Sequence, residues 1–290
     1  MTSKYQSDYR IGEDNVQLWG MDIHNPVFFV SASLIVLFVM ATVQFPEQAS
    51  EMLAGMRAWC LTTFDSFMMI SVSLILLFCL ALTVLPVASI RIGGPDAQPE
   101  FSRMSWFAML FAAGMGIGLM FWGVAEPMAY YTGSSGTPFA VQPLTPEAAD
   151  MAMAATMYHW GLHAWAIYAV IALALAFFSF NCKLPLTLRS AFYPLLGERC
   201  WGWPGHVIDT FAVLATIFGL ATSLGLGATQ VNAGLAMLFG VDEAINTKLS
   251  VIIFVTFIAI LSVVRGLEGG VRVLSNLNMV LAALLLVFIV

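Results

Sequence analysis

A run of small residues inside an apolar segment is the first feature of this sequence that could do chemistry. The run reads Ala112-Ala113-Gly114-Met115-Gly116-Ile117-Gly118, with glycines at alternate positions. Each glycine costs about 1 kcal/mol relative to alanine in a helix interior, and glycine lets the backbone unwind and approach a ligand closely. Carbonyls freed in this way can coordinate a cation, and the restarted half-helix offers its N-terminus. The run therefore predicts either a broken helix with a binding role or, through the GxxxG pair Gly114 and Gly118, a tightly packed helix.

Glu126 is the only acidic residue in the inner part of the same apolar segment. A carboxylate inside a membrane is a functional candidate by default. Pro127 follows it, however, and Tyr130 and Tyr131 are typical of an interface belt. The residue is therefore interpreted as a structural cap, an outer-gate residue or a proton carrier.

Aromatic residues are concentrated in the next apolar segment, between Met157 and Tyr168. On a regular helix Trp160 and Tyr168 would lie about 80° apart around the axis and about 12 Å apart along it, so both could line one cavity. Aromatic faces attract cations, including quaternary ammonium groups that donate no hydrogen bond. The alternative is an interface belt, and we expect Trp165 to belong to that belt or to helix packing.

His159 and His163 lie one turn apart, a spacing that can chelate a metal. A zinc site needs three or four ligands, and no third histidine or carboxylate is near in sequence. The pattern favours two hydrogen-bonding core histidines over a metal site, and the rival hypothesis is a membrane-embedded metalloenzyme that uses both histidines and Glu126. The cysteines form no CxxC pair, so no redox or zinc role is predicted for Cys60, Cys79, Cys182 and Cys200.

The composition defines the class of protein that must position these residues. Hydrophobic residues make up 60% of the 290-residue chain and charged residues 10%, against usual values of roughly 45–50% and 25%. So few charges exclude a soluble domain, and so many apolar residues exclude disorder. The net charge of −6 with 11 basic residues excludes nucleic acid as a partner. The chain is predicted to be an all-α polytopic protein of the lipid bilayer.

Seven apolar stretches approach the roughly 20 residues that a membrane-spanning helix needs. They are Pro26–Phe45, Phe64–Ile90, Trp106–Tyr131, Ala152–Phe180, Val207–Gln230, Leu249–Val264 and Leu274–Val290. The chain stops inside an apolar run, so we expect it to be the N-terminal part of a longer protein.

The basic residues predict the orientation of the spans. A cytoplasmic N-terminus places nine of the 11 basic residues inside and only Arg57 and Lys248 outside, as the positive-inside rule requires. The inside set is Lys4, Arg10, Arg91, Arg103, Lys183, Arg189, Arg199, Arg265 and Arg272.

Two further segments have simple structural interpretations. The fifth span contains Thr216 and the motif ATSLGLG at 221–227, whose small and hydroxylated residues allow close helix contact or an oxygen ligand for sodium, close packing being the commoner explanation. The glycine-rich loop 265–272 is interpreted as a hinge or as a tight connection.

Four motifs together resemble a known family. They are GMGIGLMFWGVAEP at 114–127, HWGLHAWAIYA at 159–169, ATSLGLG at 221–227 and RGLEGGVRVLSNLNM at 265–279. These motifs resemble the betaine/choline/carnitine transporter (BCCT) family, over nearly the whole chain except the N-terminal tail and the outer loops.

The resemblance implies a LeuT-type inverted-repeat transporter with twelve transmembrane helices, of which the last ten form two five-helix repeats. Residues 1–25 would be a cytoplasmic N-terminal tail, residues 26–104 two preceding transmembrane helices, and residues 105–290 the first repeat, with the second repeat absent from this chain. Such folds bind substrate at mid-membrane between repeats. The resemblance also implies a homotrimer in the cell (inner) membrane.

The resemblance assigns roles to individual residues. Ala112 and Met115 match positions whose carbonyls ligate sodium in sodium-coupled relatives. Proton-coupled choline members tend to have Asp at the position of Gly118, which favours sodium here. The implied substrate-binding residues are Ala113, Gly114, Met115, Gly116, Gly118, Trp160 and Tyr168.

One departure argues against a second sodium site. Relatives that have such a site place two hydroxyls a turn apart on the fifth span, whereas Thr216 is followed by Leu220. The family's main aromatic box lies on a helix beyond residue 290, so the substrate is not identified by this chain.

The resemblance thus implies a secondary transporter, not an enzyme, that imports a small quaternary ammonium or sulfonium zwitterion by alternating access. Betaine, carnitine, choline and dimethylsulfoniopropionate are the candidate substrates, sodium is the expected coupling ion, and no cofactor is expected. Exchange of substrate for product stays open within the same family. A passive channel is the third reading, and it predicts flux that does not saturate.

Overall fold

The computed structural model of the chain describes residues 5, 7–134 and 136–289. Lys4 and Val290, which enter the predicted orientation and the seventh predicted span, lie outside the described residues. The chain forms two compact units. The first unit is Met1–Ala97 with Tyr158–Ile217, and the second unit is Gln98–Met157 with Phe218–Val290.

Helices make up nearly all of the regular structure in the described residues. The α-helices are α1 (Val27–Gln44), α2 (Pro46–Val84), α3 (Arg103–Gly114), α4 (Ile117–Thr132), α5 (Pro146–Tyr158), α6 (Ala164–Ala176), α7 (Tyr193–Leu196), α8 (Trp203–Phe239), α9 (Ile245–Val264) and α10 (Arg272–Ile289). π-Helical turns occupy His159–His163, Phe177–Asn181 and Leu267–Val271, and 3-10 turns occupy Pro86–Ser89, Pro138–Ala140, Leu188–Phe192 and Gly197–Trp201. Before α1, the strands β1 (Asn15–Leu18) and β2 (Met21–His24) pair as an antiparallel hairpin, with Asn15 opposite His24.

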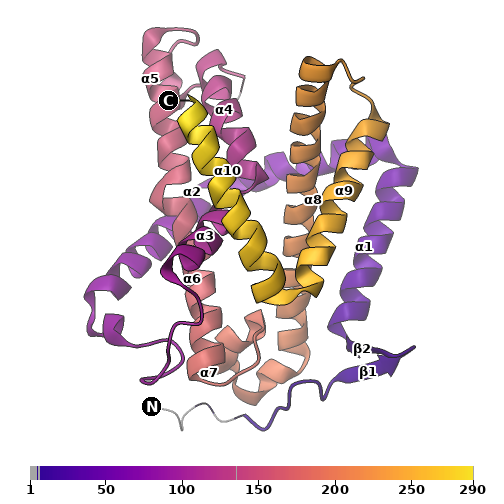
Figure 1. Ribbon diagram of the computed structural model, residues 1–290, viewed down its shortest axis with the longest axis vertical. Coiled ribbons are helices and arrows are strands. Elements are labelled where there is room, and N and C mark those ends of the chain that lie inside the picture. The colour runs from indigo at the N-terminus through magenta and orange to yellow at the C-terminus, as the bar shows by residue number, and fades with distance from the viewer. Residues whose placement is uncertain (1–4, 6, 135, 290) are drawn as a thin grey trace. The chain divides into compact units, whose positions relative to one another are not determined.

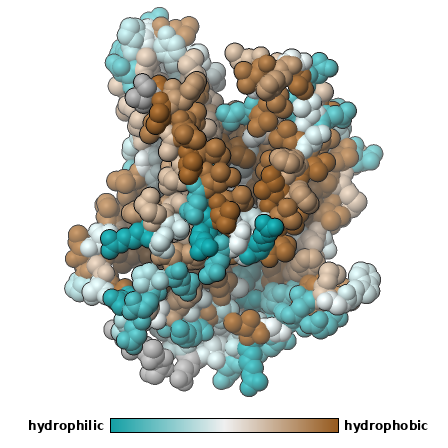
Figure 2. Space-filling model, viewed as in Figure 1, coloured by the Kyte–Doolittle hydropathy of each residue, from teal (hydrophilic) through white to brown (hydrophobic). Residues whose placement is uncertain are grey.

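Six helical segments of the described chain are long and apolar enough to cross a membrane. They are Val27–Gln44, Pro46–Val84, Pro146–Asn181, Trp203–Phe239, Ile245–Val264 and Leu267–Ile289. Most of their large apolar side chains are exposed, and Figure 2 shows hydrophobic side chains over the outer surfaces of α9 and α10. Apolar surface of this extent is unfavourable in water, so the chain is a multi-pass membrane protein.

The third predicted span, Trp106–Tyr131, is not one continuous helix. It is divided between α3, with 12 residues, and α4, with 16 residues. Neither piece alone reaches the roughly 20 residues that cross the hydrocarbon core. The structure thus confirms the break that the glycine run predicts. Because of this break, six long helices are found where seven spans were predicted.

Two predicted spans had wrong boundaries because they followed hydropathy alone. The second span was placed at Phe64–Ile90, but α2 begins at Pro46 and has 39 residues. Its added N-terminal part contains Glu47 and Glu51, so a hydropathy scan passes over it. Proline at the first helical position and a run of good helix formers nevertheless start a helix there. The fifth span was placed at Val207–Gln230, whereas α8 runs over 37 residues.

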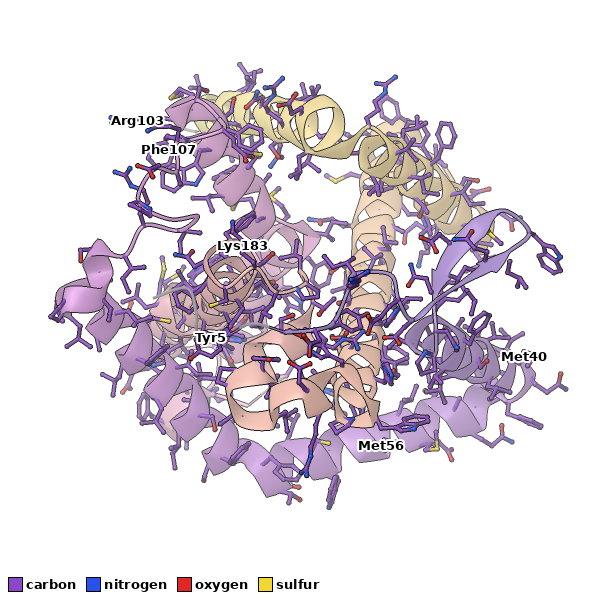
Figure 3. All side chains as sticks on the ribbon, turned by 90° about the horizontal axis from the view of Figure 1, so that it is seen from below. Tyr5, Met40, Met56, Arg103, Phe107 and Lys183 are labelled. Atoms are coloured by element: carbon purple, nitrogen blue, oxygen red, sulfur yellow. The ribbon has the colours of Figure 1, made fainter. Side chains whose placement is uncertain are left out.

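The polar end of the first unit has a small core of its own. Leu184, Tyr193, Cys200 and Trp201 form a buried cluster. Tyr5 and Tyr9 from the N-terminal segment pack against it, and Figure 3 views the molecule from this end, with Tyr5 labelled. The described part of the N-terminal segment is therefore docked at Tyr5 and Tyr9.

The two cysteines at this end lie in apolar surroundings. Burial raises the pKa of the Cys200 thiol to about 11 and also raises the pKa of Cys182. The Cys200 thiol donates to the carbonyl of Arg189 at 2.8 Å. Both thiols therefore stay protonated near neutral pH, the form that does not ligate metals.

In the second unit, α10 runs beside α3 (Figure 1), and the Asn276 amide donates to the Ser105 hydroxyl at 3.5 Å. The loop before α10 was interpreted as a hinge or a tight connection. Gly266 has φ of +70°, which glycine adopts without strain. Gly270 is buried, and a side chain there would collide with the carbonyl of Ser262. These close contacts support the tight connection.

Candidate functional site

The helix break in the second unit consists of two residues, Met115 and Gly116. Met115 has ψ of 65°, and Gly116 is extended, with φ of −89° and ψ of −179°. The Met115 N–H still donates to the Phe111 carbonyl at 2.7 Å, and the next helical bond runs from the Met120 N–H to the Gly116 carbonyl at 3.2 Å. The helical ladder is therefore interrupted at the position that the glycine run predicts.

An interrupted ladder leaves polar backbone groups without helical partners. At the end of α3 these are the carbonyls of Ala112, Ala113 and Gly114. At the start of α4 the groups without helical partners are the N–H groups of its first three residues, which begin with Ile117 and Gly118. Carbonyls suit a cation, and N–H groups at a helix start suit an anion. The break thus offers ligands for a cation and for an anion within one turn of chain.

A pocket of about 430 Å³ lies against the break within the second unit. Such a volume is in the usual range for small-ligand sites. Met115 and Gly116 contribute to its wall, and most of the remaining wall is apolar. Two polar side chains, Gln230 from α8 and Asn278 from α10, also line it. The complete lining is Met115, Gly116, Ile117, Met120, Leu224, Gly227, Ala228, Gln230, Val231, Val251, Ile252, Val255 and Asn278.

Ile117, the first residue of α4, packs closely against Gly227 of α8. A Cβ atom added to Gly227 would lie 2.7 Å from Cδ1 and 2.9 Å from Cγ2 of Ile117, closer than packed atoms approach. At Gly225, two residues earlier, an added Cβ would meet nothing within 4 Å. Close packing, the commoner explanation of the ATSLGLG motif, is thus confirmed at Gly227. This contact places the first turn of α4 directly against α8.

Glu126 lies inside α4 rather than at its end. Its side chain is 6% exposed, and Tyr130, one turn later, is a hydrogen-bonding neighbour. α4 ends at Thr132, followed by Gly133 in the left-handed conformation. The interpretation of Glu126 as a helix cap was therefore wrong, because Gly133 supplies the cap seven residues further on.

The aromatic motif of the first unit contains a second irregularity. His159–His163 form a π-helical turn, and Gly161 has non-helical ψ of −144°. The regular spacing predicted for Trp160 and Tyr168 therefore does not hold. The indole N–H of Trp165 donates to the Trp160 carbonyl at 2.9 Å. This bond satisfies a carbonyl at the kink, so Trp165 has a packing role of the kind expected.

Neighbouring rings of this motif contact one another. The His159 ring lies 5.4 Å from that of Trp160, and the His163 ring lies 4.6 Å from that of Tyr158. Tyr168 is 64% exposed, and its ring lies 5.8 Å from that of Trp165. Among the described residues, no three histidine, cysteine, aspartate or glutamate side chains are grouped as metal ligands would be.

Comparison with known families decides what kind of protein contains this break. A model of the BCCT, betaine/carnitine/choline family of transporters matches residues 26–290. The chain belongs to this family.

BCCT relatives with curated functions are similar over nearly the whole chain. Glycine betaine transporter 1 of Vibrio parahaemolyticus is 55% identical over 284 residues, which is 98% of this chain and 54% of the relative. The glycine betaine transporter OpuD of Bacillus subtilis is 44% identical over 262 residues, 90% of this chain and 51% of the relative. The high-affinity choline transport protein of Escherichia coli is 41% identical over 266 residues, 91% of this chain and 39% of the relative. The chain thus spans about half the length, or less, of these relatives.

Membership in the BCCT family excludes the rival metalloenzyme, because this is a family of transporters. The predicted site residues divide between the two units. Met115 and Gly116 line one pocket, with Ala112, Ala113, Gly114 and Gly118 on either side in sequence. Trp160 and Tyr168 belong to the first unit.

The Thr216 hydroxyl is hydrogen-bonded to the backbone of its own helix. Its hydroxyl donates to the carbonyl of Ala212, one turn earlier, at 2.8 Å. This bond occupies the proton of the hydroxyl and leaves only its lone pairs for an ion.

Sequence reasoning missed Gln230 and Asn278. Asn278 lies in the RGLEGGVRVLSNLNM motif, but nothing in that motif separates it from Asn276, which contacts Ser105 instead. Only the folded arrangement distinguishes the two asparagines.

Proposed function

We propose that the protein containing this chain is a secondary transporter that imports a small quaternary ammonium or sulfonium zwitterion by alternating access. Glycine betaine is the first candidate, with choline, carnitine and dimethylsulfoniopropionate behind it. The observation that carries the proposal is the Met115–Gly116 break and the pocket of about 430 Å³ beside it, in a chain of the BCCT family. The names of its relatives include glycine betaine and choline transporters.

The break accounts for recognition of a zwitterion without a charged side chain. A substrate carboxylate would accept from the N–H groups at the start of α4, where the helix dipole is positive. The quaternary ammonium end cannot donate a hydrogen bond, so it would be held by aromatic faces. For that reason we keep Trp160 and Tyr168 as substrate residues, together with Ala113, Gly114, Met115, Gly116 and Gly118.

Sodium is the proposed coupling ion, with the carbonyls of Ala112 and Met115 among its ligands. Ala112 belongs to the last turn of α3, whose carbonyls have no helical partner, and Met115 lies in the break itself. Neutral carbonyl oxygens are suitable ligands for a hard monovalent cation. Gly118 provides no carboxylate that could carry a proton instead.

The proposed architecture counts α3 and α4 together as one interrupted span. That gives seven spans, with a cytoplasmic N-terminus in the cell (inner) membrane, residues 26–104 preceding the core, and residues 105–290 as the first LeuT-type repeat. A homotrimer is the proposed assembly. The alternative within the family is an antiporter that exchanges substrate for product.

Uptake by the full-length gene product in liposomes tests the proposal. Labelled betaine, carnitine, choline and dimethylsulfoniopropionate would each be offered with and without an inward sodium gradient, and protein-free liposomes would give the background. Saturable uptake that requires the gradient is expected for one or more compounds. Uptake that requires internal substrate and ignores sodium would establish exchange and remove Ala112 and Met115 as sodium ligands. Flux that does not saturate would overturn the transporter proposal in favour of a channel.

A further inference from the structure

A single arginine, Arg189, organises the polar end of the first unit. Its side chain is 2% exposed. The guanidinium Nε donates to Oδ2 of Asp209 at 2.6 Å, and the backbone N–H of Arg189 donates to Oδ1 at 3.0 Å. Its two terminal nitrogens lie 2.6 Å from Nε2 of His24 and 3.4 Å from Nδ1 of His206. One cation thus contacts one carboxylate and two of the four histidines of the chain.

These contacts define the protonation state of both histidines. An arginine in a protein stays protonated and only donates hydrogen bonds. Nε2 of His24 and Nδ1 of His206 must therefore be acceptors, which requires neutral rings. In His24 the proton is then on Nδ1, which faces Oδ1 of Asn15 at 3.3 Å. Protonation of either ring would replace an acceptor by a donor that points at the guanidinium.

The same cluster fastens the N-terminal segment to the rest of the unit. His24 is the last residue of β2, whereas Arg189 lies 165 positions later in the chain. The Tyr9 ring stacks on Trp201 with centroids 4.5 Å apart, and the guanidinium lies 5.9 Å from each of these rings. Outside the cluster, the Ser7 hydroxyl donates to Glu198 at 3.2 Å.

We infer that the Arg189 cluster is a proton-operated clasp, which holds residues 7–24 at neutral pH and releases them when His24 and His206 are protonated. The clasp is independent of the substrate and of the coupling ion, since it uses no residue of the helix break.

The direction of the pH effect follows from the His24 environment. Burial, and after it the charge of Arg189, lower the pKa of His24 below its usual value of 6.5. A depressed pKa means that docking favours the neutral ring. The stabilisation is complete above about pH 6.5, the pKa of the undocked histidine, and is lost as the pH falls below it.

The charges around His24 come from every element that packs against it. Asp14, in the turn before β1, and Asp209, on α8, favour protonation, while Arg189 opposes it. His206, also on α8, lies 6.1 Å away between ring centroids. Protonation of both histidines would place three cations against two carboxylates. His24 and Asp209 also line a pocket of about 390 Å³, which gives protons a route to the cluster.

Hydrogen exchange on the full-length gene product tests the clasp. Exchange of backbone amides in residues 7–24, corrected for the intrinsic effect of pH, would be compared at about pH 8 and about pH 5.5. The expected result is a loss of protection of about tenfold or more at the lower pH. In the double variant His24→Gln, His206→Gln the protection should be the same at both pH values, because glutamine accepts from arginine and does not titrate. The matched control is His163→Gln, which removes a histidine outside the cluster and should behave like the wild type.

Two results would overturn the clasp. One is wild-type protection that does not change with pH, and the other is a pH effect that persists in the double variant. Nitrogen-15 NMR of labelled histidine in the wild-type protein adds a measurement that does not depend on any variant folding. It should show neutral His24 with the proton on Nδ1 and an apparent pKa below about 6.5. A charged His24 at neutral pH would contradict the inference.

Discussion

The Arg189 cluster and the Met115–Gly116 break are opposite solutions for polar groups in an apolar protein. At the cluster, charged side chains are buried but paired, with Arg189 against Asp209 and two histidines. At the break, backbone groups are released from the helix, and a pocket of about 430 Å³ lies against them. The first arrangement satisfies its polar groups within the protein, while the second leaves them available.

The contrast indicates where each unit places its function. Buried polar groups are nearly always hydrogen-bonded in native structures, so the mutual pairing of Arg189, Asp209 and the two histidines needs no ligand to explain it. Groups left open at a helix break need a partner from outside the helix, which is the position of substrates and ions in transporters with discontinuous helices. Variants that open the cluster should therefore affect stability first, and variants that disturb the break should affect transport first.

The largest expected effect comes from opening the cluster. Arg189→Ala would leave the Asp209 carboxylate buried without a counter-ion, which typically destabilises a protein by about 3–5 kcal/mol. The measurement is the apparent Tm of the purified protein in detergent. Arg199→Ala, an exposed arginine of the same loop, should change it little. Equal Tm losses in the two variants would show that the cluster is not a stabilising centre.

The next effect concerns the packing of Gly227 against Ile117, next to the break. Gly227→Ala places a methyl group against Ile117, and overpacking of this kind destabilises by about 1–3 kcal/mol. We expect a drop in the maximal uptake rate of about tenfold, and partial recovery in the double variant Gly227→Ala, Ile117→Ala. Gly225→Ala is the matched control, because a methyl group there meets open space. Similar uptake by Gly227→Ala and Gly225→Ala would show that the contact between Gly227 and Ile117 does not matter for transport.

A charge in the break should change the coupling rather than the fold. Gly118→Asp introduces a carboxylate beside the proposed sodium ligands, so the stimulation of uptake by sodium should fall by about tenfold, equivalent to about 1.4 kcal/mol. Uptake would be measured with and without a sodium gradient at several pH values. Sodium dependence identical to that of the wild type would count against the assignment of this stretch to the ion.

The smallest effect is expected at the π-helical turn His159–His163. There the Trp160 carbonyl already has a hydrogen-bond donor. Trp165→Phe keeps the aromatic bulk but removes the donor to the Trp160 carbonyl, a loss of about 1 kcal/mol. The apparent Tm should fall slightly while the substrate KM stays close to that of the wild type. A large rise in KM would move Trp165 from packing to substrate binding.

Local features were predictable from the sequence, and long-range ones were not. The break was predictable because glycines at alternate positions weaken a helix within a few residues of themselves. Spans such as α1 were also found within one or two residues of their observed bounds. The start of α2 was missed because the glutamates of its first turns hide a good helix former from a hydropathy scan.

The Arg189 cluster left no signal in the sequence. His24, Arg189 and Asp209 belong to separate elements, and their grouping depends on a hairpin that precedes the first span. The pocket at the break was likewise only half predictable. The glycine run predicted the backbone part of its wall. Gln230 and Asn278, in contrast, are brought to the pocket by α8 and α10.

The length of α2 has a consequence for the bilayer around the protein. Its 39 residues extend over about 58 Å, because an α-helix rises by about 1.5 Å per residue. Within the first unit it runs obliquely to α1 (Figure 1). At a tilt of about 40°, the upper end of the usual range, such a helix still covers about 45 Å, which is the full membrane thickness including both headgroup layers. α2 is therefore long enough to reach the headgroups of both leaflets at once, and we expect its tilt to follow changes in membrane thickness.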